Sequence, residues 1–128
     1  MSQPDLMRQI MRDKQLASLG DSVVNFVYSL ALTRLKGCPQ GTKVSDRILA
    51  QALRQSGLRD RLGTRVTKKD LANASEAVLA EAYLKDLLTI GESVQLICQY
   101  SEDPANGLSD LLKLAAEKLQ GAELENLR

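Results

Sequence analysis

The stretch that decides the fold is LASLGDSVVNFV, residues 16–27. Its apolar residues recur at steps of three and four and continue through Leu30 and Ala31, which is the spacing of one face of an α-helix. We therefore expect a helix over residues 14–36. Its predicted buried face consists of Leu16, Leu19, Val23, Val27, Leu30 and Ala31.

A glycine followed by an acid interrupts this apolar stretch. Gly20 has no side chain, so a second helix can pass close to the backbone there. Asp21 would then need a cation or hydrogen-bond donors, because burying a lone carboxylate is costly. The alternative is that Asp21 lies at the solvated edge of the helix, and periodicity alone favours this alternative. The polar strip beside it consists of Ser18, Ser22, Asn25 and Ser29.

The rest of the chain shows helical periodicity and lacks the strict alternation typical of strands. Further helices are expected over residues 4–11, 46–56, 68–90, 91–100 and 108–119, with a short helical turn over 58–62 and a loose tail over 120–128. Aromatic residues make up only 3% of the chain, so the core must consist of Leu, Val, Ile and Ala. The predicted fold class is all-α, with about seven helices in a single domain over residues 1–128.

Composition excludes several kinds of catalytic site. The chain has no histidine, which removes Ser-His and Cys-His nucleophile pairs and the imidazole ligands of zinc enzymes. Cys38 and Cys98 match no zinc motif and are expected to be reduced thiols. Chemistry must therefore come from carboxylates, lysines, hydroxyls or a metal bound through oxygen, and oxygen ligands favour Mg²⁺ or Mn²⁺.

Neither a signal peptide nor a membrane span is expected. The N-terminal residues MSQPDLMRQ lack the charged-then-apolar pattern of a signal peptide. No apolar run reaches the roughly 18 residues that cross a bilayer. The expected location is the cytoplasm.

The net charge of +1 hides an uneven distribution of charged residues. Residues 43–69 contain eight basic residues and only two acidic ones, whereas six acids oppose three bases from residue 101 onward. A basic middle suggests a face that meets a polyanion. A solvated helix surface explains the same pattern equally well.

A second polar pair lies in the alanine-rich helix expected over residues 68–90. Asn73 and Glu76 are three residues apart, so they share one helix face and can offer oxygen atoms to one site. Both residues are equally compatible with an exposed surface.

Four motifs, in order along the chain, resemble those of the ribonuclease III family. They are Leu19-Gly20-Asp21-Ser22-Val23-Val24, Val44-Ser45-Asp46-Arg47-Ile48-Leu49-Ala50, the stretch from Ser56 to Gly63, and Ala72-Asn73-Ala74-Ser75-Glu76-Ala77 followed by Tyr83-Leu84. Their family counterparts are Leu-Gly-Asp-Ala-Val, Val-Ser-Asn-x-x-Leu-Ala, a short helix, and Ala-Asp-x-x-Glu-Ala with a later Tyr-Leu. The resemblance is strongest over residues 16–88.

This resemblance implies an all-α ribonuclease III-like endonuclease domain that cuts double-stranded RNA as a homodimer. In the family, each subunit binds Mg²⁺ through a cluster of carboxylates, and the two cuts leave short 3′ overhangs. The corresponding acids here are Asp21 and Glu76, which we expect to be catalytic and to bind Mg²⁺ or Mn²⁺, with Asn73 in support.

The chain departs from the family pattern at three usually acidic positions, which are occupied by Lys14, Ala17 and Asn73. Fewer carboxylates and a nearby lysine weaken the hold on a hard cation, although Mg²⁺ often uses only one or two protein carboxylates. No double-stranded-RNA-binding domain is recognisable. The chain therefore looks most like the short, stand-alone members of the family, such as the mini and archaeal-type forms.

RNA contacts would then come from the domain itself. The basic residues predicted to contact phosphates are Arg47, Arg54, Arg59, Arg61, Lys68 and Lys69. Two alternatives to a nuclease stay open. One is a non-catalytic ribonuclease III-like RNA-binding protein whose reduced acidic cluster no longer holds metal, and the other is a helical dimer that serves only protein interactions.

Overall fold

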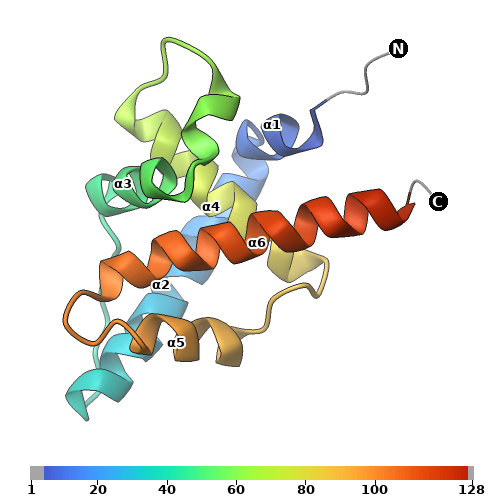
Figure 1. Cartoon of the computed structure of the whole chain (residues 1–128). Helices are drawn as coiled ribbons and strands as arrows, with labels where there is room; N and C mark the ends of the chain where they lie inside the picture. Colours follow the sequence, from blue (N-terminus) through green and yellow to red (C-terminus); the bar gives the residue numbers. More distant parts are fainter. Residues whose placement is uncertain (1–4, 127–128) are drawn as a thin grey trace.

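A computed structural model describes residues 5–126, and all of the regular structure in this range is helical (Figure 1). The six α-helices are α1 (Leu6–Met11), α2 (Lys14–Lys36), α3 (Asp46–Ser56), α4 (Lys68–Leu84), α5 (Ile90–Cys98) and α6 (Pro104–Asn126). A short 3-10 helix, η1 (Leu58–Leu62), lies between α3 and α4. The all-α prediction with about seven helical elements is confirmed.

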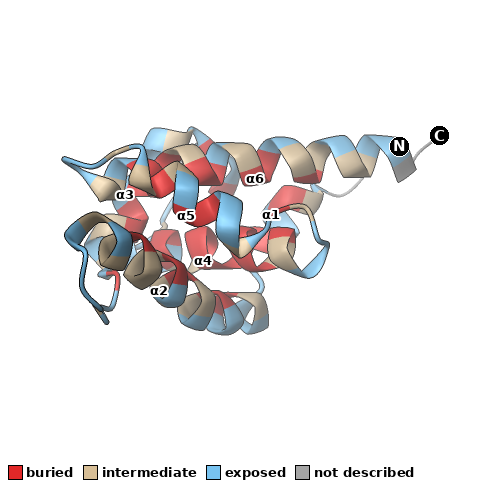
Figure 2. Ribbon diagram, turned by 90° about the horizontal axis from the view of Figure 1, so that it is seen from below, coloured by how far each residue is buried: buried red, intermediate tan, exposed pale blue. Residues whose placement is uncertain are grey.

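The alanine-rich helix α4 lies at the centre of the molecule. It packs against α1, α2, α3 and α6, and buried residues surround it in Figure 2. All of its alanines are buried, together with Leu71, Val78 and Leu79. Small side chains allow neighbouring helices to approach closely, which is why this helix can serve as the core of the bundle.

The closest approach between helices is at Gly20, where α2 crosses α4. A Cβ atom placed on Gly20 would lie 2.0 Å from the main-chain carbonyl oxygen of Glu76 and 2.9 Å from its Cα atom. No side chain fits at that distance, so glycine is required at this position. The expectation that Gly20 lets a second helix pass beside Asp21 is confirmed.

The buried face of α2 differs from the predicted one. The buried residues are Ala17, Gly20, Val24, Val27 and Ala31, so only two of the six expected residues are fully buried. The larger apolar residues lie around the helix from this face: Leu19 and Phe26 are exposed, and Leu16, Val23 and Leu30 are half-buried. The close contact with α4 explains the difference, because it selects the face with the smallest side chains.

By length and composition alone, α2 is also apolar enough to cross a membrane. A third of its most apolar window is buried inside the protein. The core helix of a soluble protein passes the same test. In this fold α2 packs against α4 and α5.

Several helix ends differ from the predicted ones. The first helix starts at Leu6, with Asp5 as its N-cap, and the expected start at Pro4 lies outside the described residues. The long helix α4 ends at Leu84 and not at Ile90, because the chain turns at Asp86, which has a left-handed backbone (φ 58°).

The last helix is longer than predicted at both ends. It begins at Pro104 and continues through residues 120–126, which were expected to be a loose tail. Pro104 occupies the first turn, where proline is tolerated. The helix continues through Gly107. The lack of a side chain there lets α6 approach α5 closely, since a Cβ atom on Gly107 would lie 2.8 Å from the Cα of Ile97.

The crossing at Gly20 can be tested by adding a single methyl group. We expect Gly20→Ala to lower the free energy of unfolding by about 3 kcal/mol, the upper end of typical overpacking costs, because the helices must separate. The measurement is urea denaturation followed by circular dichroism.

Gly121→Ala is the matched control, because Gly121 is exposed on α6 with nothing within 4 Å of an added Cβ atom. It should leave stability unchanged or raise it by about 0.5–1 kcal/mol through helix propensity. Equal stability of the two variants would contradict the close crossing.

Candidate functional site

The crossing of α2 and α4 brings the two predicted catalytic acids to one cavity. Asp21 follows Gly20 on α2, and Glu76 is the residue of α4 that Gly20 contacts. Both residues line an open surface cavity of about 290 Å³, which we call the carboxylate cavity. Its other lining residues are Lys14, Ala17, Ser18, Lys69 and Asn73. The sequence alone left open whether Asp21 and Glu76 were surface residues on separate faces, and the fold brings them together.

Glu76 is an unusual carboxyl group because only 4% of the residue is exposed. Burial, and then a hydrogen bond to Asp21 and the negative charge of Asp21, raise the pKa of Glu76 from its ordinary value of 4.5 to about 8. Lys69 opposes this rise, while Asp46 adds to it. At neutral pH, and without a cation, Glu76 therefore keeps its proton.

Asn25 fixes the position of Asp21 and was not singled out as a site residue from the sequence. Its side-chain Nδ2 donates to Asp21 Oδ1 at 3.2 Å, one turn away on α2. Its Oδ1 accepts a hydrogen bond of 2.8 Å from the main-chain N–H of Val44, just before α3. The spacing of four residues between Asp21 and Asn25 was the available signal. Asn25 thus joins the site to the loop between α2 and α3.

Two contacts hold α3 against the same part of α4. The buried Ser75 hydroxyl donates to the main-chain oxygen of Leu49 at 2.8 Å. Lys69 pairs with Asp46 of α3, with 3.4 Å between Nζ and Oδ2. Because this ion pair is largely exposed, it contributes little stability. It does place Asp46 next to Lys69, which lines the carboxylate cavity.

The oxygen atoms that line the carboxylate cavity are suitable ligands for a hard cation that retains several of its water ligands. Asp21 and Glu76 offer carboxylate oxygens and Asn73 an amide oxygen, the ligand type that Mg²⁺ and Mn²⁺ prefer. Between residues 5 and 126, no three Asp, Glu, Cys or His side chains cluster closely enough to form an all-protein metal site. A cation here would need water or substrate oxygens for the rest of its shell.

The residues predicted to bind RNA do not gather at one cavity. Lys69 alone among them lines the carboxylate cavity. Arg59 donates to the main-chain oxygen of Gly63 at 2.7 Å, and Arg61 lies 3.6 Å from Asp5. Arg47 lines a separate cavity that includes Tyr28. Arg54 and Lys68 are exposed on α3 and at the start of α4. Their role in RNA binding stays a prediction.

Comparison with known protein families adds an independent finding. The family model described as Ribonuclease III matches residues 14–119 of this 128-residue chain. The match runs from the first residue of α2 into α6, so it includes both helices of the carboxylate cavity. No curated protein matches the chain.

The raised pKa of Glu76 predicts how stability changes with pH. Between about pH 4.5 and 8 the unfolded chain loses the Glu76 proton whereas the folded chain keeps it, so this group lowers stability as pH rises. Glu76→Gln does not titrate. In EDTA, we expect its stability relative to wild type to increase from pH 5 to pH 8, by at most about 4 kcal/mol at 1.36 kcal/mol per pKa unit.

Asp21→Asn is the companion variant, because it removes the negative charge next to Glu76. Its stability should fall less between pH 5 and 8 than that of wild type. Denaturation curves at a series of pH values give both results. A difference between Glu76→Gln and wild type that does not change with pH would contradict the raised pKa of Glu76.

Proposed function

The chain belongs to the ribonuclease III family, and from this we propose that it is a metal-dependent endoribonuclease that cuts double-stranded or structured RNA as a homodimer. Family membership supports a ribonuclease-type activity on RNA in general. The observation that carries the finer proposal is the meeting of Asp21 and Glu76 in one open cavity.

In this proposal Asp21 and Glu76 hold Mg²⁺ or Mn²⁺, and Asn73 supports a ligand or a water molecule. The bound cation would supply a water of lowered pKa and would offset the negative charge on the phosphate. Lys14 and Lys69, which line the same cavity, would attract the phosphate oxygens of the strand to be cut. Asn25 keeps Asp21 in position. No histidine is needed for this chemistry.

One observation favours the alternative of a non-catalytic RNA-binding protein. The carboxylate cavity contains as many lysines as carboxylates, and the positions of Lys14, Ala17 and Asn73 are usually acidic in the family. Such a cavity would hold a cation less tightly than one with a full set of acids. Binding of RNA without cleavage would identify this alternative.

An apolar stripe on the outer face of α2 supports the homodimer. Leu19, Val23, Phe26 and Leu30 follow one another at steps of four, three and four residues, the spacing of a helix–helix contact. Leu19 is 41% exposed and Phe26 is 55% exposed, whereas Val23 and Leu30 are half-buried and pack partly against the core. Exposed apolar residues arranged in a stripe mark interaction surfaces more often than scattered ones do. A second copy of the chain would cover this stripe.

Cleavage of a long RNA duplex tests the proposed activity. We expect cleavage with Mg²⁺ or Mn²⁺ and none in EDTA. Asp21→Asn and Glu76→Gln should each lower the rate by roughly 100-fold or more, a loss of about 2.7 kcal/mol in transition-state stabilisation. Glu81→Gln is the control, since Glu81 lies on the same helix but pairs with Lys85 at 3.5 Å.

Three outcomes separate the possibilities. Activity that survives both substitutions at Asp21 and Glu76 would locate the chemistry elsewhere. Duplex binding without cleavage by wild type would favour the non-catalytic protein. Failure to bind duplex RNA even at low salt would favour the third possibility, a helical dimer that serves only protein interactions.

The homodimer is tested by placing a charge in the apolar stripe. We expect wild type to sediment as a dimer in analytical ultracentrifugation and Phe26→Asp to shift towards monomer, because the new carboxylate would be buried without a partner. Leu124→Asp is the matched control, since Leu124 is 64% exposed but lies on α6. A monomeric wild type, or equal effects of the two variants, would contradict the proposed interface.

A further inference from the structure

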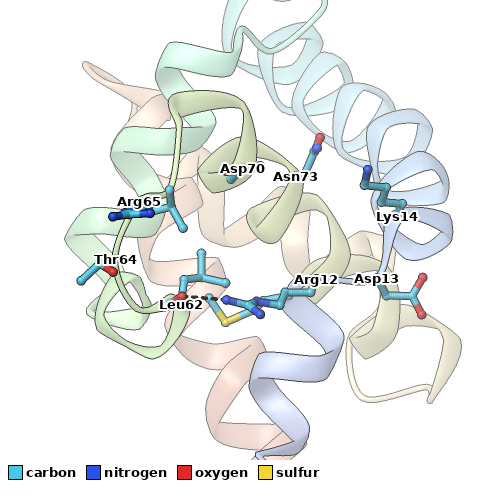
Figure 3. A pocket seen from close by; sticks show the side chains of 10 residues that line it. Arg12, Asp13, Lys14, Leu62, Thr64, Arg65, Asp70 and Asn73 are labelled. Atoms are coloured by element: carbon cyan, nitrogen blue, oxygen red, sulfur yellow. Dashed lines mark hydrogen bonds between the residues drawn. The ribbon is translucent and has the colours of Figure 1, made fainter.

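A second cavity lies beside the carboxylate cavity. Its volume is about 300 Å³, and it lies between the corner that joins α1 to α2, the loop over residues 63–67 and the first turns of α4 (Figure 3). Three positively charged residues line it: Arg12, Lys14 and Arg65. We call it the basic cavity.

The basic cavity adjoins the proposed catalytic site directly. Lys14 and Asn73 line both cavities, one from the start of α2 and the other from α4. A polymer lying across Lys14 and Asn73 would therefore reach both cavities at once. This is the geometry needed to hold a chain at one point and act on it at the next.

The acids of the basic cavity are engaged in helix capping. Asp13 accepts hydrogen bonds from the main-chain N–H groups of Gln15 and Leu16, at 2.9 and 3.0 Å. Asp70 accepts one from the N–H of Thr67 at 2.9 Å, and this bond lowers the pKa of Asp70.

The three cations, in contrast, make no direct contact with an acid, although the charges of Lys14 and Arg12 help to lower the pKa of Asp70. Among the residues that the structure describes, none of Arg12, Lys14 and Arg65 forms an ion pair within 4.0 Å. Asp70 offsets part of this positive charge without direct contact, and the rest is available to an anion that enters the cavity.

The loop that carries Arg65 is held in place from two sides. Arg12 Nη2 donates to the main-chain oxygen of Leu62 at 3.1 Å, and Arg59 Nη1 donates to that of Gly63 at 2.7 Å. Arg65 itself has a left-handed backbone (φ 60°), which is unfavourable for a residue with a side chain. Such strain persists where the surrounding structure imposes it, and it is common at ligand sites. Arg65 is thus presented at the cavity by a fixed loop.

We propose that the basic cavity binds a backbone phosphate of the RNA next to the phosphate that is cut, and so positions the strand over Asp21 and Glu76. This inference rests on the proposed nuclease function. Guanidinium groups suit phosphate because they donate several hydrogen bonds from one plane, and Lys14 adds a point charge. Lys14 stands at a position that is usually acidic in the family. In this proposal its positive charge attracts the RNA phosphate at the place where an acid would otherwise bind metal.

Binding of a short, blunt RNA duplex in EDTA tests the inference without any cleavage. We expect Arg65→Gln and Lys14→Gln each to weaken binding by about tenfold and to reduce the slope of log affinity against log salt by about one. Arg65→Gly should weaken binding equally while preserving or raising stability, because glycine accepts the left-handed backbone. Arg34→Gln, at an exposed position near the far end of α2, is the control and should bind like wild type.

Neutral methylphosphonates placed one at a time along the duplex identify the phosphate. One position close to the cut should weaken binding by wild type and have no effect on Arg65→Gln. Affinity and salt slope of Arg65→Gln equal to those of Arg34→Gln would overturn the inference. An equal loss of affinity for methylphosphonates at every position of the duplex would also overturn the inference. Because binding is read in EDTA, absence of cleavage by wild type would count against the proposed nuclease and not against the basic cavity.

Discussion

The contact between the backbone of Gly20 and the backbone of Glu76 is the constraint on which the rest of the structure depends. It fixes how closely α2 and α4 cross, with no room for a side chain between them. It also fixes the site, because the residue after Gly20 is Asp21 and the residue it touches carries the second carboxyl group. Two acids fifty-five positions apart in the chain can meet in one cavity only because the helices that carry them are in backbone contact.

The same constraint determines the outer surface of α2. A helix in such close contact must turn its smallest residues inward, and Ala17, Gly20 and Ala31 are all buried. The larger residues, Leu19 and Phe26, then remain on the outside. Burying large apolar side chains is the main source of folding stability, so a helix that leaves them exposed has surface to offer a partner. The geometry that brings the acids together and the apolar stripe of the proposed dimer thus have one cause.

Sequence reasoning predicted the elements of this fold better than their orientation and ends. The helix over residues 14–36 and the close approach at Gly20 follow from spacing and from the absence of a side chain. The buried face of that helix could not be predicted, because α2 has two apolar stripes and periodicity does not tell which one meets α4. Both ends of α6 were predicted wrongly, because proline and glycine ordinarily mark breaks in a helix, whereas Gly107 serves the contact with Ile97.

For the candidate site, the motifs that resemble a known family singled out Asp21 and Glu76, and the fold places both residues at one cavity. Asn25 was missed although its spacing from Asp21 was a local signal. Asp46 and the basic cavity were missed because they depend on contacts between segments that are distant in the sequence.

If the proposed function holds, the charge balance of the two cavities explains how a site with few acids would bind RNA. A full set of carboxylates around a phosphate would repel the substrate unless metal ions offset them, so such a site depends on metal both for chemistry and for binding. Here two carboxylates share their cavity with Lys14 and Lys69, and Arg12 and Arg65 lie in the cavity next to it. Part of the positive charge that the phosphate needs would then be supplied permanently by side chains. A single cation between Asp21 and Glu76 would then be needed only for catalysis. Its weaker binding would be offset by the tighter binding of the RNA to the basic side chains.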